Sequence, residues 1–231
     1  MNKVYRNIIF VLFYLLAVSV FADDKKEILT YDDQVYDFGH IGIDFKLFHT
    51  FKYVNRTDKT VTITDLDVSC DCSEVNYPSA AIAPGDTAYF NLIFSTKDYY
   101  GPTTKSFTVY TTDPSYPSIK YFYQSIVGQW YDGLKPEPLS IFFLPGKDEI
   151  KISLTNRFFD EIKLVKIDQY DQIFSTEIIN DEADKNETLD ILVKPGENLS
   201  KGTLNSVLTL SVDNGKEKPS IFSIPIKIVR Y

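Results

Sequence analysis

The chain has very little cysteine and histidine. Its 231 residues include only Cys70 and Cys72, and only His40 and His49. Two cysteines cannot build a disulfide framework, so apolar cores must stabilise the chain. The sequence also contains no G-x-S-x-G, no H-E-x-x-H and no glycine-rich phosphate loop, and two histidines leave little room for a catalytic triad. We therefore predict a protein that is not an enzyme and has no cofactor.

Basic residues are also outnumbered. The chain has 24 lysines and arginines against 32 aspartates and glutamates, which gives a formal net charge of -8. A surface with this charge repels phosphate backbones and anionic lipids. Nucleic-acid binding is therefore not expected.

Residues 1–22 differ from the rest of the chain. Lys3 and Arg6 precede an uncharged apolar run, Ile8 to Ala22, which ends in a small residue. A charged start, an apolar run and a small residue at the cut are typical of a secretory signal peptide. The run is shorter than the ~20 residues of a spanning helix, so we expect cleavage, with no integral membrane span afterwards. Cleavage would change the net charge from -8 to -10, because Lys3 and Arg6 are lost. The predicted location is secreted, periplasmic or in the cell envelope.

Apolar side chains alternate with period two from Leu29 onward, and no stretch shows helical periodicity. Two apolar residues before Asp65, Val61 and Ile63, share one parity. Leu66, Val68 and Cys70, after it, have the opposite parity, so a β-bulge near Asp65 is needed to turn both sets inward. Inward-facing alternation is predicted for three other strands, from Phe45, Leu47, His49, Phe51 and Tyr53, from Ala88, Phe90, Leu92 and Phe94, and from Phe107 and Val109.

The strand plan repeats in the second half of the chain. The segment SLTNRFFDEIKLVKI, from Ser153, parallels FKYVNRTDKTVTITDL, from Phe51, as a strand, an Asn-Arg turn and another strand. Each copy has roughly 100 residues and about seven short strands, which predicts two tandem antiparallel β-sandwiches of immunoglobulin-like type. The expected organisation is a signal peptide (1–22), a first domain (29–128), a linker (129–138) and a degenerate second domain (139–231). The second copy lacks cysteine and histidine, so any special chemistry belongs to the first.

Several motifs of the first copy resemble one family in order and spacing. They are VYDFGHI, HTFKYVNRTDKTVTITDLDVSCDCS, IAPGDTAYFNLIF and TVYTTDP, and they cover about Tyr36 to Gly128. The segment resembles the bacterial family DUF1573, which implies a secreted or periplasmic immunoglobulin-like domain, related in fold to the domains of major sperm protein and ciliary proteins, with no established enzymatic activity. The family usually has Gly between its two cysteines where this chain has Asp71. A backbone that needed φ > 0 at this position would be strained here.

The two cysteines form the candidate site of the chain. On an extended strand, Cys70 and Cys72 would place both sulfurs on one face, near the upper limit of Cα separation for a disulfide. Three states are open. A disulfide would close a very small, easily reduced ring, which is typical of a redox-active bond. Two thiolates could instead bind copper or zinc, with His49 or His40 as a nitrogen donor, or both could be small buried side chains.

Aromatic residues gather near the end of the first copy and in the linker. The candidates for an interaction surface are Tyr99, Tyr100, Trp130 and Tyr131. Such residues either pack one domain on the other or present a surface to a partner. The leading hypothesis is an exported, non-catalytic binding or scaffold protein that contacts another envelope or extracellular protein through its sandwich edges and loops. The alternative is a thiol-redox or copper- or zinc-handling protein that uses Cys70 and Cys72.

Overall fold

The computed structural model describes residues 34–79, 81–130 and 133–231. The predicted signal peptide, residues 1–22, lies outside the described residues, and so does Tyr131. Every element named over the described part of the chain is a β-strand. The prediction of an all-β fold is therefore confirmed.

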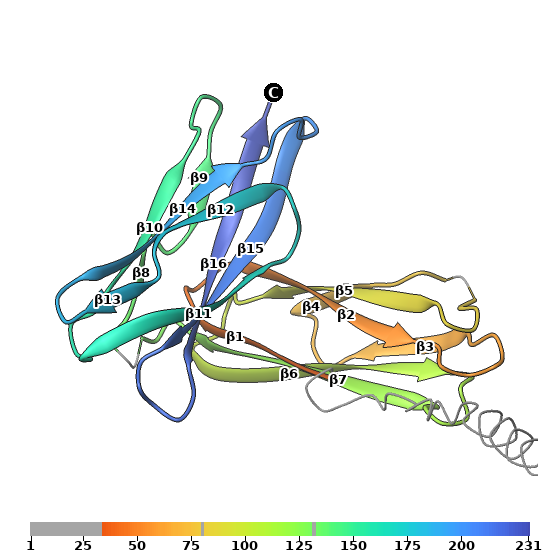
Figure 1. Ribbon diagram of the computed structural model, residues 1–231. Coiled ribbons are helices and arrows are strands. Elements are labelled where there is room, and N and C mark those ends of the chain that lie inside the picture. Colours follow the sequence, from red (N-terminus) through yellow and green to blue (C-terminus); the bar gives the residue numbers. More distant parts are fainter. Residues whose placement is uncertain (1–33, 80, 131–132) are drawn as a thin grey trace, which may run out of the picture.

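The first half of the chain forms a sandwich of two layers (Figure 1). One layer contains β1 (Val35–Ile41), β7 (Ser118–Val127), β6 (Gly101–Thr111) and β3 (Ile63–Val68), and the other contains β2 (Lys46–Val54), β5 (Thr87–Ser95) and β4 (Ser73–Asn76). Alternation along the strands buries one face of each layer: Phe90, Leu92 and Phe94 of β5 are fully buried, as are Leu47 of β2 and Val109 of β6. These side chains form the first core, as the sequence predicted.

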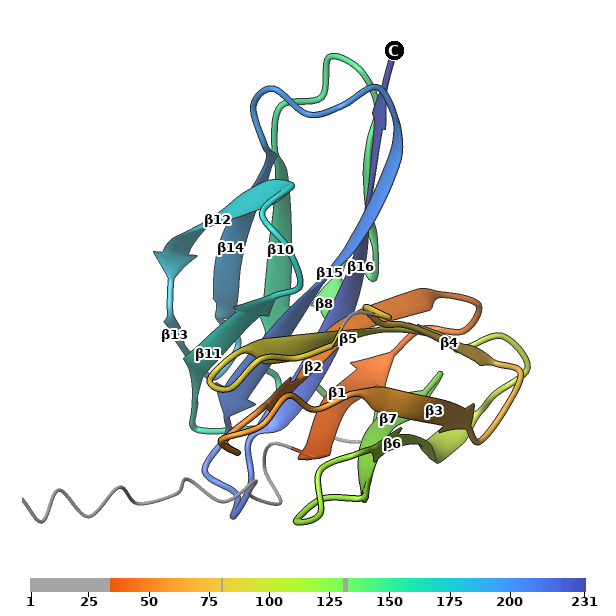
Figure 2. The same ribbon diagram turned by 90° about the vertical axis from the view of Figure 1, so that its right-hand side faces the viewer.

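The second half forms a similar sandwich. One layer contains β9 (Ile141–Phe143), β16 (Ser220–Arg230), β15 (Gly202–Asp213), β11 (Glu161–Gln169) and β13 (Glu182–Asp184), and the other contains β12 (Phe174–Asn180), β14 (Thr188–Pro195), β10 (Ile150–Thr155) and β8 (Pro136–Glu137). A second core lies between them. In Figures 1 and 2 the second sandwich stands at a steep angle to the first.

The internal repeat is visible in the buried asparagines of the two Asn-Arg turns. Asn55 and Asn156 have no exposed surface. The Asn55 side-chain amide donates to the carbonyl of Ile82, and that of Asn156 donates to the carbonyl of Ala183, each 27 residues further on. Each side-chain oxygen accepts a backbone N–H of its own turn, from Thr57 and from Phe159. The same residue type therefore holds the same turn in both copies.

Strand β1 joins the two sandwiches into one nine-stranded sheet. It runs parallel to β7 on one side and pairs with β16 on the other, where His40 lies opposite Phe222. Gly39 has a φ of +63°, and a Cβ at this position would overlap the backbone of Ile221, so the close approach of β1 to β16 requires glycine. The Ser223 hydroxyl donates to the Phe38 carbonyl at 2.7 Å across the same junction.

Three details differ from the sequence predictions. The sandwiches are not purely antiparallel, because β1 and β9 pair in parallel with β7 and β16. Described residues of the predicted linker 129–138 pack into the second sandwich, since Leu134 is fully buried in its core and β8 pairs with β10. The predicted register shift near Asp65 is present, but Val68 is 40% exposed because β3 is an edge strand that ends there.

Candidate functional site

Cys70 and Cys72 form a disulfide at the point where the chain crosses between the two layers of the first sandwich. Strand β3 belongs to the nine-stranded sheet and ends at Val68, whereas β4 belongs to the opposite sheet and begins at Ser73. The cysteines lie in the turn between these strands. They do not lie on an extended strand, as the sequence interpretation assumed.

The turn accounts for the pairing of two cysteines so close in sequence. The backbone N–H of Ser73 donates to the carbonyl of Cys70, and the two cysteine Cα atoms are 5.2 Å apart. A fully extended chain would separate them by about 6.6 Å, near the limit for a disulfide. Asp71, which occupies the position of the family's glycine, is not among the described residues with positive φ. The replacement of glycine by aspartate therefore brings no left-handed strain here.

A serine hydroxyl lies beside the disulfide and is itself held by a tyrosine. The Oγ of Ser73 lies 3.6 Å from the Sγ of Cys70 and 3.6 Å from the Sγ of Cys72. Behind it, the Tyr123 hydroxyl donates to Ser73 Oγ at 2.6 Å. Tyr123 lies on β7 and its side chain has no exposed surface, and burial raises its pKa. The tyrosine therefore stays protonated and holds Ser73 in place against the sulfurs.

Cys70, Cys72 and His49 do not come together as a metal-binding group in the described part of the chain. No group of three or more metal-ligating side chains comes together there, and both sulfurs are in the disulfide. His49 lies on β2 instead, where its ring stacks on Tyr36 with 3.6 Å between the ring centroids. Burial lowers its pKa to about 4, so it is a neutral packing residue near neutral pH.

The four aromatic candidates separate into different environments. Trp130 is half-buried and stacks on His40 and Phe222, at centroid distances of 5.8 Å and 6.3 Å, so it packs the two sandwiches together. Tyr99 is half-buried against Phe94 of the first core. Tyr100 is 68% exposed and remains available to a partner. Tyr131 lies outside the described residues.

A groove that the sequence did not reveal lies where the two sandwiches meet. This elbow groove encloses about 390 Å³. Its lining comes from the β1–β2 turn and β2 of the first sandwich, and from β9, β15 and β16 of the second: Asp44, Phe45, Lys46, Phe48, Ser140, Ile141, Phe142, Asn205, Ser206, Pro225, Ile226 and Lys227. Strand β2 is hydrogen-bonded to β5 on one side only. The groove is therefore lined by both domains and includes an edge strand of the first sandwich.

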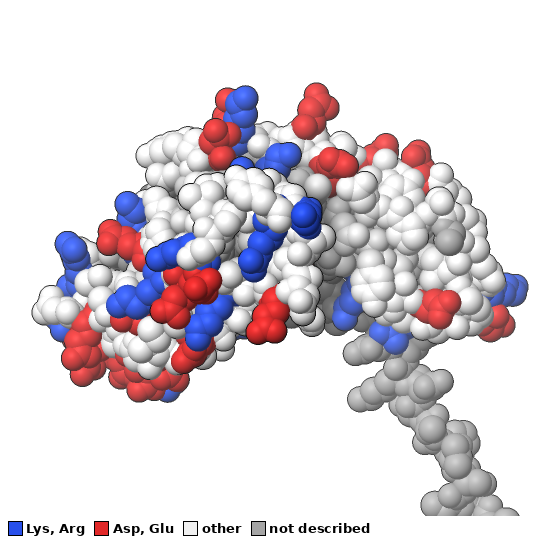
Figure 3. All heavy atoms as spheres, turned by 90° about the horizontal axis from the view of Figure 1, so that it is seen from above, with Lys and Arg blue, Asp and Glu red and all other residues white. Residues whose placement is uncertain are grey.

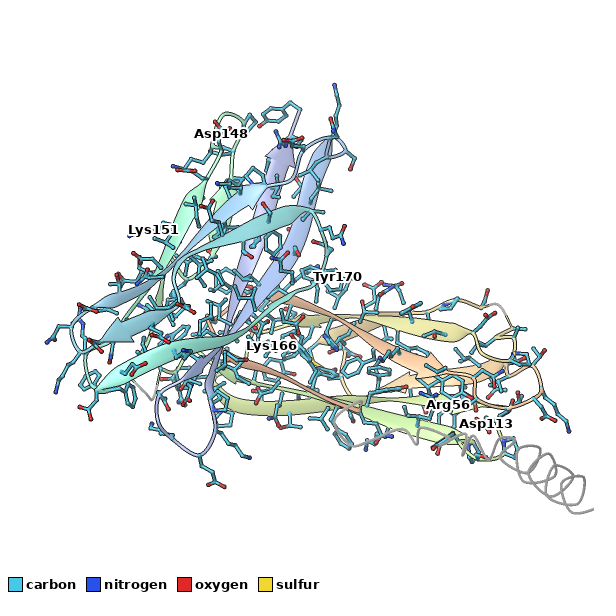
Figure 4. All side chains as sticks on the ribbon, viewed as in Figure 1. Arg56, Asp113, Asp148, Lys151, Lys166 and Tyr170 are labelled. Carbon is cyan, nitrogen blue, oxygen red and sulfur yellow. A yellow bond between two sulfur atoms is a disulfide. The ribbon has the colours of Figure 1, made fainter. Side chains whose placement is uncertain are left out.

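Polar and aromatic contacts between the two sandwiches fix their relative angle and so the shape of the groove. The Tyr36 hydroxyl of β1 donates to the Asp168 carboxylate of β11 at 3.0 Å, and burial, together with the Asp168 charge, raises the pKa of Tyr36. Phe48 lies against Tyr170, with 5.4 Å between ring centroids, and Figure 4 shows Tyr170 at the angle between the sandwiches. Val207 of β15 is buried in the first core. These contacts join distant parts of the sequence, so local patterns could not predict them.

The fold defines a tandem immunoglobulin-like β-sandwich protein with a disulfide in the first sandwich. Residues 29–123 match the family described as a protein of unknown function, DUF1573, and this segment of the chain belongs to that family. No curated protein matches the chain in sequence.

Solved structures with similar folds have little sequence in common with this chain. A protein of unknown function from Porphyromonas gingivalis W83 is 10% identical, with 84% of this chain and 95% of that chain covered and a TM-score of 0.35. SSP-19 of Caenorhabditis elegans, an MSP-domain protein like family member, is 12% identical over 42% of this chain and 99% of its own, with a TM-score of 0.35. The CupB2 chaperone of Pseudomonas aeruginosa is 8% identical over 80% and 96%, with a TM-score of 0.28.

Proposed function

We propose that this protein is an exported, non-catalytic binding protein that holds an extended segment of another envelope or extracellular protein in the elbow groove. The observation that carries the proposal is the groove itself, which is lined from both sandwiches and encloses about 390 Å³. Ligand sites in proteins are commonly concave and lie at domain boundaries. The apolar run at Ile8–Ala22 supports export. Over the described residues, no helix has the length and apolar character needed to cross a bilayer.

The lining favours a polypeptide with apolar side chains and a carboxylate. Phe142 is 47% exposed and lines the groove, so its ring offers an apolar contact surface to a bound segment. The ammonium group of Lys227 lies 5.5 Å from the centre of the Phe142 ring. Lys46 is a second positive charge in the lining, whereas Asp44 is the one carboxylate there. The protein as a whole is acidic, so two lysines at one groove favour an acidic segment over a basic one.

The position of β2 at the edge of its sheet favours an extended conformation of the bound segment. An unpaired edge offers a row of backbone donors and acceptors to which a partner strand can add. On the face that Figure 3 shows, basic and acidic side chains are interspersed over the second sandwich, at the left. A nucleic-acid partner would need a continuous basic surface, so we propose a protein partner.

A site-specific photo-crosslinker tests this proposal in the cell envelope. Placed at Phe142, it should capture one reproducible partner, and Lys46→Glu should reduce the yield because it reverses a charge at the groove. Tyr89 is 54% exposed on β5 and does not line the groove, so the same crosslinker at Tyr89 is the matched control. No reproducible partner from position 142, or the same capture from both positions, would contradict the proposal.

A further inference from the structure

The disulfide is placed where it contributes little to the stability of the fold. In the chain-entropy account, the stabilisation from a disulfide grows with the length of the loop that it closes, and this bond links residues only two apart. Its turn is also held by other bonds. The backbone N–H of Ser69 donates to the carbonyl of Ser106 on β6, and the N–H of Ser95 on β5 donates to the carbonyl of Cys72. The turn is therefore anchored to both layers without the disulfide.

The two sulfurs differ in their surroundings. Both cysteines are half-buried, with the exposed Asp71 between them. Cys72 packs against the first core. The Sγ of Cys70 is therefore the better point of attack for a thiolate that approaches from solvent, and attack there makes Cys72 the leaving group.

Ser73 is in position to stabilise that leaving group. A serine hydroxyl has a single hydrogen to donate. The Tyr123 hydroxyl already donates to Ser73 Oγ at 2.6 Å, so the serine hydrogen is left for another acceptor. The two sulfurs, each 3.6 Å away, lie within reach of it. Hydrogen bonds to an ionised group are stronger than those to a neutral one, so this bond strengthens when a thiolate forms.

We propose that Cys70 and Cys72 are a redox-active pair that exchanges disulfides with external dithiols, and that Ser73, positioned by Tyr123, stabilises the departing thiolate of Cys72. One thiolate of the dithiol attacks Sγ of Cys70, the Cys70–Cys72 bond breaks, and its electron pair goes to Sγ of Cys72. The second thiol of the external molecule then displaces Cys70 from the mixed disulfide. The external dithiol is oxidised to a disulfide, and its two protons end on the two cysteines.

The rate of reduction of the full chain by dithiothreitol tests this proposal. Free thiols are trapped by alkylation at timed intervals and counted by mass spectrometry. We expect the folded protein to be reduced at a rate that sub-denaturing urea does not change. Ser73→Ala should slow the reduction about tenfold, because a charge-assisted hydrogen bond is lost in the transition state. Ser125→Ala is the matched control, since the buried Ser125 hydroxyl on β7 has no hydrogen-bond partner among the described residues.

Tyrosine variants separate positioning from general destabilisation. Tyr123→Phe should slow the reduction several-fold, as expected from the loss of one neutral hydrogen bond. Tyr121→Phe removes another buried hydroxyl of the same strand, which donates to the Lys52 carbonyl, and should leave the rate unchanged. Ser73→Thr should restore most of the rate because it keeps the hydroxyl.

Three results would overturn the inference. The first is reduction that occurs only as fast as the chain unfolds, which would mark a purely structural bond. The second is equal rates for Ser73→Ala and Ser125→Ala. The third applies if the Ser73 variants fail to fold, and comes from the pH dependence of alkylation of the reduced wild-type protein. Two thiols with ordinary pKa values would overturn the proposal, whereas one thiol with a lowered pKa would support it.

Discussion

Mild acid should destabilise the folded protein through His49. This residue lies on β2 next to the second sandwich, with its ring stacked on Tyr36. Burial is the main cause that lowers its pKa from 6.5 to about 4. The negative charge of Asp168 opposes this shift, and the positive charge of Lys166 adds to it. The neutral imidazole is therefore the form that the folded structure accommodates.

The sign and size of the effect follow from these two pKa values. Between pH 6.5 and about pH 4 the unfolded chain binds a proton at His49 that the folded protein does not bind. The stabilisation is therefore complete above pH 6.5 and is lost as the pH falls towards 4. The difference between the two pKa values corresponds to about 3 kcal/mol of unfolding free energy.

Urea unfolding of the wild type and of His49→Phe, measured from about pH 7.5 to about pH 4, checks this expectation. Phenylalanine keeps a flat aromatic ring against Tyr36 but cannot take up a proton. The wild type should lose about 3 kcal/mol more than the variant over this range, because the titration of the carboxylates is common to both proteins. Two parallel stability curves would show that His49 is not held neutral by the fold, and the reasoning would be wrong.

Three further predictions concern the turns and the shared sheet. In urea titrations, Asn55→Ala should lower the unfolding free energy by about 3 kcal/mol, because it leaves buried turn groups unpaired. The control Asn91→Ala removes only an exposed hydrogen bond with Thr50 and should lower it by under about 1 kcal/mol. Gly39→Ala should cost at least about 2 kcal/mol and Gly85→Ala about 1 kcal/mol, since both glycines have positive φ but only Gly39 lies against another backbone; equal losses would contradict the close approach of β1 to β16. Calorimetry should show one unfolding transition for both sandwiches, because they share a sheet, and two separated transitions would show that the junction is weak.

Much of the fold was predictable because alternation is local. The buried faces of β5 and β6 follow from every second residue, as with Phe90, Leu92, Phe107 and Val109. The opposite parities of Val61–Ile63 and Leu66 were enough to predict the register shift near Asp65. The repeated Asn-Arg turn was also visible, since Asn55 and Asn156 precede similar strands.

The candidate site was predictable only in part. The two cysteines were evident in the sequence as the candidate site residues. Their pairing depended on a turn between β3 and β4 that alternation does not specify. His49 does not join them, because it lies on β2 with its ring stacked on Tyr36. The serine and tyrosine at the disulfide come from different strands, and Tyr123 is 50 residues from Ser73, so no local motif connects them.

By itself, the sequence determined the strand-rich fold, the two copies, the family of the first copy and the cysteine pair, because each depends on residues that are neighbours along the chain. Only the tertiary structure decided that β1 would join the sandwiches into one sheet and that the elbow groove would form between them. The physical reason is that strand edges pair through the backbone, which every residue carries, so the choice of partner depends on shape and on single positions such as Gly39.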